Sequence, residues 1–114
     1  LMDRLPEALV GKLRSSGDAV VDLTVRNLAM SAAMVVHHRK QSDDLQAAGS
    51  ERVNLRCTEL LRQLEPNAVK ARLERLLEAA VQNKGDDVSF LERWGYDKHQ
   101  KEAITLAIHA VAEA

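Results

Sequence analysis

The feature that most constrains this chain is an apolar tract from Ala19 to Val36. Its apolar residues recur at helical spacing and cover most of the circumference of a helix. One stripe holds Val21, Val25, Leu28, Ala32 and Val35, and an adjoining stripe holds Val20, Leu23, Met30 and Met34. A helix of this kind packs against several neighbours. The sequence therefore predicts a long central helix that begins near Asp18 and runs into the high forties. After Val36 the residues become polar, so the helix is expected either to project into solvent there or to end early.

The same tract is long enough to be considered as a membrane span. It contains Asp22, Arg26 and Asn27, however, and such residues are costly against lipid. Asp22 and Arg26 lie four residues apart, which is the spacing of a helical ion pair. We therefore expect a helix buried in protein and no contact with a membrane.

Five further helices are predicted, one before this helix and four after it. Two of the six helices are expected to be short. The first follows Pro6, carries Leu5, Leu9 and Leu13, and ends at Ser15–Gly17. Gly49 and Ser50 are read as the stop of the central helix and the cap of the next. The apolar stripes of the later helices are Val53, Cys57, Leu60 and Leu64; Val69, Leu73, Leu76 and Ala80; Val88, Leu91 and Trp94; and Ile104, Ala107, Ile108 and Val111.

Local signals separate these later helices. Glu65-Pro66 breaks the chain, because a residue before proline disfavours the α conformation, and Asn67 is expected to cap the helix that follows. Asp97, with Gln100 three residues on, has the pattern of a capping box for the last helix. Connections this short favour antiparallel neighbours.

Length and composition agree with a single helical domain over residues 1–114. Hydrophobic residues make up 46% of the chain, with Leu and Ala the commonest, which argues against an all-β fold. The expected fold class is all-α: a compact antiparallel bundle of five to six helices with a long central second helix. The 16 basic residues nearly balance the 17 acidic ones, which argues against a non-specific nucleic-acid binder.

The single cysteine excludes a disulfide framework. Cys57 lies in an apolar stripe and is expected to be a small core residue. No basic leader followed by an apolar stretch is visible, so a cytoplasmic location is expected. No cofactor is expected, and no metal site either, because the adjacent His37 and His38 point about 100° apart on a helix.

His37 and Lys40 form a His-x-x-Lys spacing, in which an ammonium can stabilise a phosphoryl group on the imidazole. With Ser42 and Gly49 this segment resembles the hallmark of histidine-phosphotransfer domains, which are helical bundles of similar size. The resemblance implies that His37 accepts the phosphoryl group and that Lys40 is its charge partner. Gln41 stands where that family has glycine, and Gly49 comes two residues late. The alternative is that these residues form the solvated basic end of a helix.

All three aromatic residues, Phe90, Trp94 and Tyr96, fall within seven positions. The segment resembles the loop of ubiquitin-associated domains, although Ala103 comes too late for the alanine that follows it there. Aromatic side chains anchor many interfaces. We take these three, together with Met30 and Met34 of the central helix, as a candidate interface. The alternative is a small core that fixes the last helix.

No glycine-rich phosphate loop, nucleophile elbow or His-Glu-x-x-His motif occurs in the sequence. We therefore expect a non-catalytic interaction, regulatory or adaptor domain, whose surplus apolar surface is buried by another protein chain or by self-association. Nucleic acid is not expected as a partner. A phosphorelay module using His37 is the alternative, and a ligand or metal held between helices by histidines is a third possibility.

Overall fold

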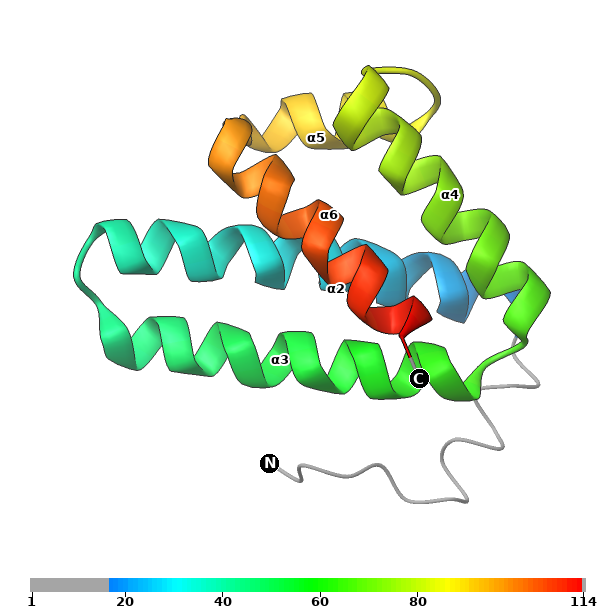
Figure 1. The fold of residues 1–114 in the computed structure, drawn as a ribbon, viewed down its shortest axis with the longest axis horizontal. Coiled ribbons are helices and arrows are strands. Elements are labelled where there is room, and N and C mark those ends of the chain that lie inside the picture. The colour runs from blue at the N-terminus through cyan, green and yellow to red at the C-terminus, as the bar shows by residue number, and fades with distance from the viewer. Residues whose placement is uncertain (1–16, 114) are drawn as a thin grey trace.

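The central helix predicted from the apolar tract is α2, Asp18–Lys40, in a computed structural model that describes residues 17–113. Nine of its residues are buried, and α2 packs against α3, α4 and α6 (Figure 1). Val25, Leu28, Ala29 and Ala33 are fully buried. The prediction of a core helix is confirmed for the first stripe, which is buried, whereas Leu23 of the adjoining stripe is exposed.

Within residues 17–113, α2 is also the one helix long and apolar enough to cross a membrane by length and composition. Core helices pass the same test. Here 44% of its most apolar stretch is buried inside the fold, and Asp22 makes ion pairs with other residues of the chain. The apolar character of α2 is thus used in packing.

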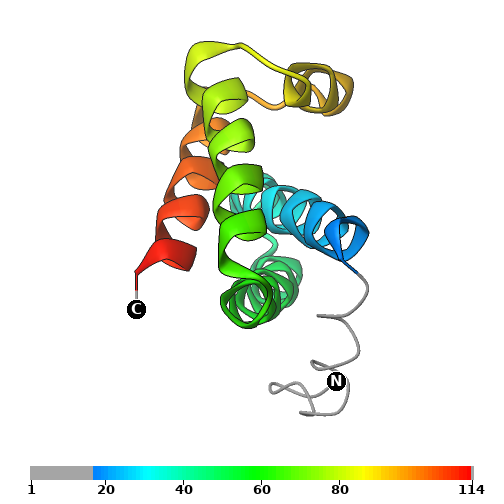
Figure 2. The same ribbon diagram turned by 90° about the vertical axis from the view of Figure 1, so that its right-hand side faces the viewer.

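The remaining helices are α3 (Asp44–Gln63), α4 (Pro66–Gln82), α5 (Asp87–Trp94) and α6 (Lys98–Ala112). Residues 17–113 therefore form five helices and no strand, and the all-α class is confirmed. α2 and α3 make an antiparallel hairpin, and α6 runs obliquely across α2 (Figure 1). In Figure 2, α6 lies at the edge of the molecule opposite the start of α2. The predicted helix after Pro6 lies outside the described residues.

The predicted boundary at Gly49 and Ser50 is wrong, and the alternative, that the central helix ends early after Val36, is confirmed. α2 ends at Lys40, and both residues lie inside α3. The turn comes earlier because Ser42 adopts a left-handed conformation (φ 55°) and the Asp43 side chain caps α3 by accepting a hydrogen bond from the Gln46 N–H. Since glycine costs only about 1 kcal/mol inside a helix, packing of α3 along α2 overrides that signal.

The predicted cap at Asn67 is also wrong by two residues. Glu65 is the N-cap of α4, and its carboxylate accepts hydrogen bonds from the N–H groups of Asn67 and Ala68. Pro66 occupies the first helical position, where its missing N–H has no consequence. The capping box of Asp97 and Gln100 is confirmed, with both reciprocal hydrogen bonds present.

The core lies where α2, α3, α4 and α6 meet. Its largest fully buried side chains come from every helix of the described chain: Val25, Leu28, Leu61, Leu76, Leu91 and Ile104. Cys57 is buried among them, as predicted, and burial raises the pKa of its thiol. A thiol kept protonated in this way is a poor nucleophile.

Candidate functional site

The predicted aromatic cluster is divided by the fold. Phe90 and Tyr96 are half-buried, pack against the core, and meet edge to face with ring centroids 6.4 Å apart. The Arg26 guanidinium lies 5.6 Å from the centre of the Phe90 ring. Burial raises the pKa of the Tyr96 hydroxyl. Trp94 is 53% exposed, so of the three rings it is the one most available to a partner.

Met30 and Met34 are half-buried on α2. Leu23, which is exposed, precedes Met30 by seven residues, and Met34 follows Met30 by four, so these three side chains share one side of α2. Arg26, which contacts the aromatic cluster, lies on a neighbouring side of the same helix. The predicted interface residues thus belong to two parts of the fold: Met30 and Met34 to α2, and the aromatic residues to α5 and the connection that follows it.

His37 and Lys40 lie in the last turn of α2, and both are exposed. The rings of His37 and His38 meet edge to face, with centroids 5.4 Å apart. Lys40 Nζ donates to Asp97 Oδ2 across 2.8 Å. This hydrogen bond, with one from the Gln100 backbone N–H, lowers the pKa of Asp97. Lys40 therefore fastens the start of α6 to the end of α2.

The other end of α6 is also fastened. Arg62 of α3 donates to the backbone carbonyls of Ala110, Val111 and Glu113, satisfying oxygens at the helix end that have no partner within α6. Near its start, the Gln100 side chain donates to the carbonyl of Ala33. α6 is thus held by polar contacts at both of its ends.

Arg72 of α4 is the main polar residue inside the fold, with 5% of its surface exposed. Its guanidinium makes two hydrogen bonds to the Asp87 carboxylate, of 2.6 and 2.9 Å, and a third of 2.9 Å to Asp22. A bidentate arginine–carboxylate pair is among the strongest hydrogen-bonded contacts in proteins. We call these three residues the arginine junction. It joins α4 to α5 and to α2.

The charges of the arginine junction are compensated within the chain. Partial burial on its own would raise the pKa of Asp22, but hydrogen bonds and charge from Arg72 and Arg26 lower it below its ordinary value. Arg72 is not among the residues that the sequence pattern singled out. Its position was a usable signal, because it falls inside the stripe of Val69, Leu73 and Leu76.

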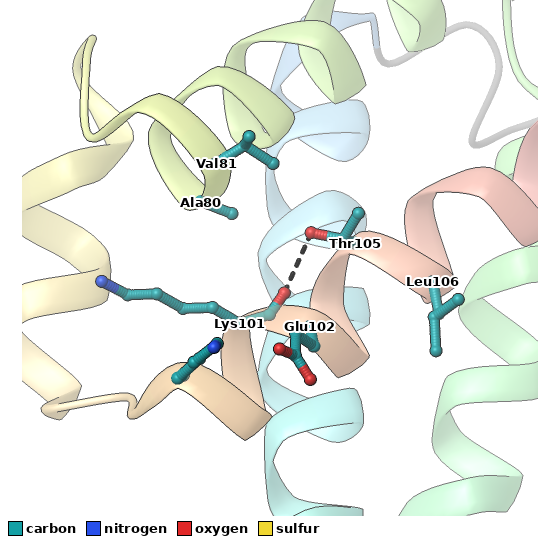
Figure 3. A pocket seen from close by; sticks show the side chains of 7 residues that line it. Ala80, Val81, Lys101, Glu102, Thr105 and Leu106 are labelled. Atoms are coloured by element: carbon teal, nitrogen blue, oxygen red, sulfur yellow. Dashed lines mark hydrogen bonds between the residues drawn. The ribbon is translucent and has the colours of Figure 1, made fainter.

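The largest exposed apolar residue on α6 is Leu106, with 71% of its surface exposed. It lies between two hollows. One is about 780 Å³ and lies between α6 and the end of α4, where Val81 is 64% exposed. Figure 3 shows Ala80 and Val81 on α4 opposite Lys101, Glu102 and Thr105 on α6, with Leu106 on the far side.

The second hollow lies between α6 and the α2–α3 hairpin and measures about 660 Å³. Leu55 of α3, 59% exposed, forms one wall, and α6 forms the other. An ion pair between Arg39 and Glu51 lies at its α2 end. We call the apolar surface around both hollows the α6 face; it comprises Leu55, Val81, Ala103, Leu106, Ala107 and Ala110.

The prediction of the last helix emphasised its buried stripe, and Ile104, Ala107, Ile108 and Val111 are indeed buried. Leu106 was missed as an interface residue because it lies off that stripe. The signal available was a large apolar residue on the otherwise polar side of an amphipathic helix. Among residues 17–113, no group of three His, Cys, Asp or Glu side chains is placed to hold a metal ion.

Comparison with protein families gives one match. The profile described as "Uncharacterised conserved protein UCP020893" matches residues 1–111. The chain belongs to this family. No curated protein and no solved structure matches it. The family description names no activity, so the function has to be argued from the surfaces of the domain itself.

Proposed function

We propose that this family member is a non-catalytic protein-interaction domain, and that the α6 face is its contact surface. The observation that carries the proposal is Leu106, a large apolar side chain exposed between two hollows, one of which also exposes Val81 and the other Leu55. Contiguous exposed apolar surface of this kind is typical of protein-binding sites. Interfaces of this type have an apolar centre and a polar rim.

The attachment of α6 supports the same proposal. Its start is held by Lys40 and by the Gln100 side chain, and its end is held by Arg62. A surface that is already ordered loses little conformational entropy when a partner binds. The charged residues at the margin of the hollows, such as Arg39, Glu51 and Lys101, supply the polar rim.

The phosphorelay alternative receives less support from the geometry. His37 is exposed, as a phosphoryl acceptor needs to be. Lys40, however, already donates to Asp97 and would have to leave that carboxylate to neutralise a phosphoryl group on His37. Loss of the contact would also leave the Gln100 side chain as the remaining polar link between the start of α6 and α2.

The proposal predicts that the α6 face is covered in cells in a way that depends on Leu106. Glu102 is exposed at the edge of this face, so a Glu102→Cys variant can be labelled with a maleimide. We expect slower labelling in cells that express the chain at its native level than in dilute purified protein. The buried Cys57 contributes little background.

Two further variants provide controls. Glu78→Cys, on the exposed side of α4, should label at the same rate in cells and in dilute solution. Adding Leu106→Glu to Glu102→Cys should restore fast labelling in cells. Equal labelling of Glu102→Cys in both settings, or protection that survives Leu106→Glu, would overturn the proposed function.

A further inference from the structure

We propose that the α6 face is covered by a second copy of this chain, with the two α6 helices antiparallel about a two-fold axis near Leu106. This inference rests on the proposed function and names its partner. Two-fold dimers use the same patch on both subunits, so the patch has to be complementary to itself. The α6 face meets that requirement in shape and in charge.

The α6 face is complementary to itself in shape because an exposed leucine lies beside a hollow. Leu106 projects from α6, and the alanines Ala103, Ala107 and Ala110 line the adjacent hollow. A two-fold axis beside Leu106 brings the leucine of each copy to the hollow of the other. Alanine side chains are short, so the two helix backbones can approach closely, with each leucine packed as a knob into a hole.

The charge requirement selects the antiparallel arrangement. Antiparallel pairing centred on Leu106 places Glu102 beside His109 of the second copy, and His99 beside Glu113 of the second copy. All four side chains are exposed and lie on the Leu106 side of α6. A parallel pairing would instead place each glutamate beside its own equivalent. An imidazole can donate a hydrogen bond to a carboxylate of the second copy, and it forms an ion pair with it when protonated, whereas two facing carboxylates repel each other.

The position of α6 leaves room for this contact. Figure 2 shows α6 at the outer edge of the molecule, with α3 set back from it. A second α6 would approach the first from this outer edge. Leu55 of α3 is then close enough to the centre to widen the apolar contact, since it shares a hollow with Leu106.

The first test is the dissociation constant of the full-length chain, measured by sedimentation equilibrium over a dilution series. We expect a reversible dimer. Leu106→Glu should weaken it about 100-fold or more, because two buried leucines are lost and two carboxylates are placed at the centre. Leu45→Glu is the matched control: Leu45 is even more exposed, at 81%, but lies on the first turn of α3, away from both hollows. It should leave the dimer unchanged.

The second test probes the antiparallel register by charge exchange. His109→Glu places a carboxylate beside Glu102 of the second copy and should weaken the dimer about 10-fold. Adding Glu102→Lys restores opposite charges across the interface and should recover most of that loss. Thermal unfolding of each variant in dilute solution confirms that the subunit itself is folded.

The outcomes separate the two proposals. A chain that stays monomeric at every concentration, while Glu102→Cys remains protected in cells through Leu106, overturns the dimer and leaves the proposed function standing with a different protein on the face. A dimer insensitive to Leu106→Glu, or equally sensitive to Leu45→Glu, overturns the inference as well. Failure of Glu102→Lys to rescue His109→Glu overturns the antiparallel register.

Discussion

The arginine junction and the α6 face are opposite departures from the usual distribution of residues. At the junction a charged side chain, Arg72, is buried, whereas on the α6 face a large apolar side chain, Leu106, is exposed. Arg72 finds both of its carboxylate partners within the chain. Leu106 has a hollow on each side of it and remains open to solvent.

This difference indicates that the buried Arg72 contributes to the stability of the fold, whereas the exposed Leu106 contributes to binding a partner. A buried charge has to be paired inside the protein, because leaving it unpaired is strongly destabilising. An exposed leucine costs the folded chain little and gains free energy only when another surface covers it. Changes at the junction should therefore alter stability, and changes on the α6 face should alter association.

The largest expected effect is at Arg72. Arg72→Met removes the guanidinium and leaves the buried Asp87 carboxylate without its bidentate partner, so the free energy of unfolding should fall by about 3–5 kcal/mol. Urea unfolding followed by circular dichroism measures this. Arg75→Met, at an exposed position on the same helix, should change the value by less than about 0.5 kcal/mol.

The double variant Arg72→Met/Asp87→Met refines this prediction. It leaves no unpaired buried charge between the two positions, so it should be more stable than Arg72→Met alone. If both variants lose the same stability, the loss comes from the packing of the arginine side chain. An unpaired buried charge is then not the reason why the junction matters for stability.

A smaller effect is expected at Asp22, whose side chain is partly exposed, so solvent screens its ion pairs. Asp22→Asn should lower the free energy of unfolding by about 1 kcal/mol at neutral pH. Because the folded pKa of Asp22 is depressed, its contribution is fully present above the ordinary value of 3.8 and is lost as pH falls through the folded value.

Acid titration of unfolding checks this sign. The stability difference between the original chain and Asp22→Asn should shrink as pH falls below 3.8. A difference that stays constant over the acid range would show that the carboxylate's charge does not contribute to the junction.

The smallest effect on folding is expected on the α6 face. Leu106→Ala, measured at a dilution where the chain is monomeric, should change the free energy of unfolding by less than about 0.5 kcal/mol. Leu76→Ala, at a fully buried leucine of α4, should cost about 2–5 kcal/mol. Comparable losses for the two leucines would mean that Leu106 is part of the core of the subunit.

Much of the fold was predictable because its signals are local. The apolar tract identified α2 as the central helix, the spacing of Ile104, Ala107, Ile108 and Val111 identified the buried side of α6, and Asp97 and Gln100 identified its start. The boundary at Gly49 was wrong because a weak local signal was overridden by the packing of α3 along α2. The helix predicted after Pro6 lies outside the described residues.

The fold does not test whether the predicted interface residues bind a partner, but it shows where they lie. Phe90 and Tyr96 lie together, as their closeness in sequence suggests. The α6 face could not be found that way, since Leu55, Val81 and Leu106 come from three helices separated by more than twenty residues. Nothing in the spacing of such residues records that they share a surface.

The sequence by itself determined the all-α class, the central place of α2 and the capping of α6, because periodicity and capping act within a few residues. Only the tertiary structure decided that Arg72 is buried between two carboxylates and that Leu106 is left between two hollows. Both outcomes depend on which helices meet. A buried charge or an exposed leucine is defined by its neighbours in space, and these come from distant parts of the chain.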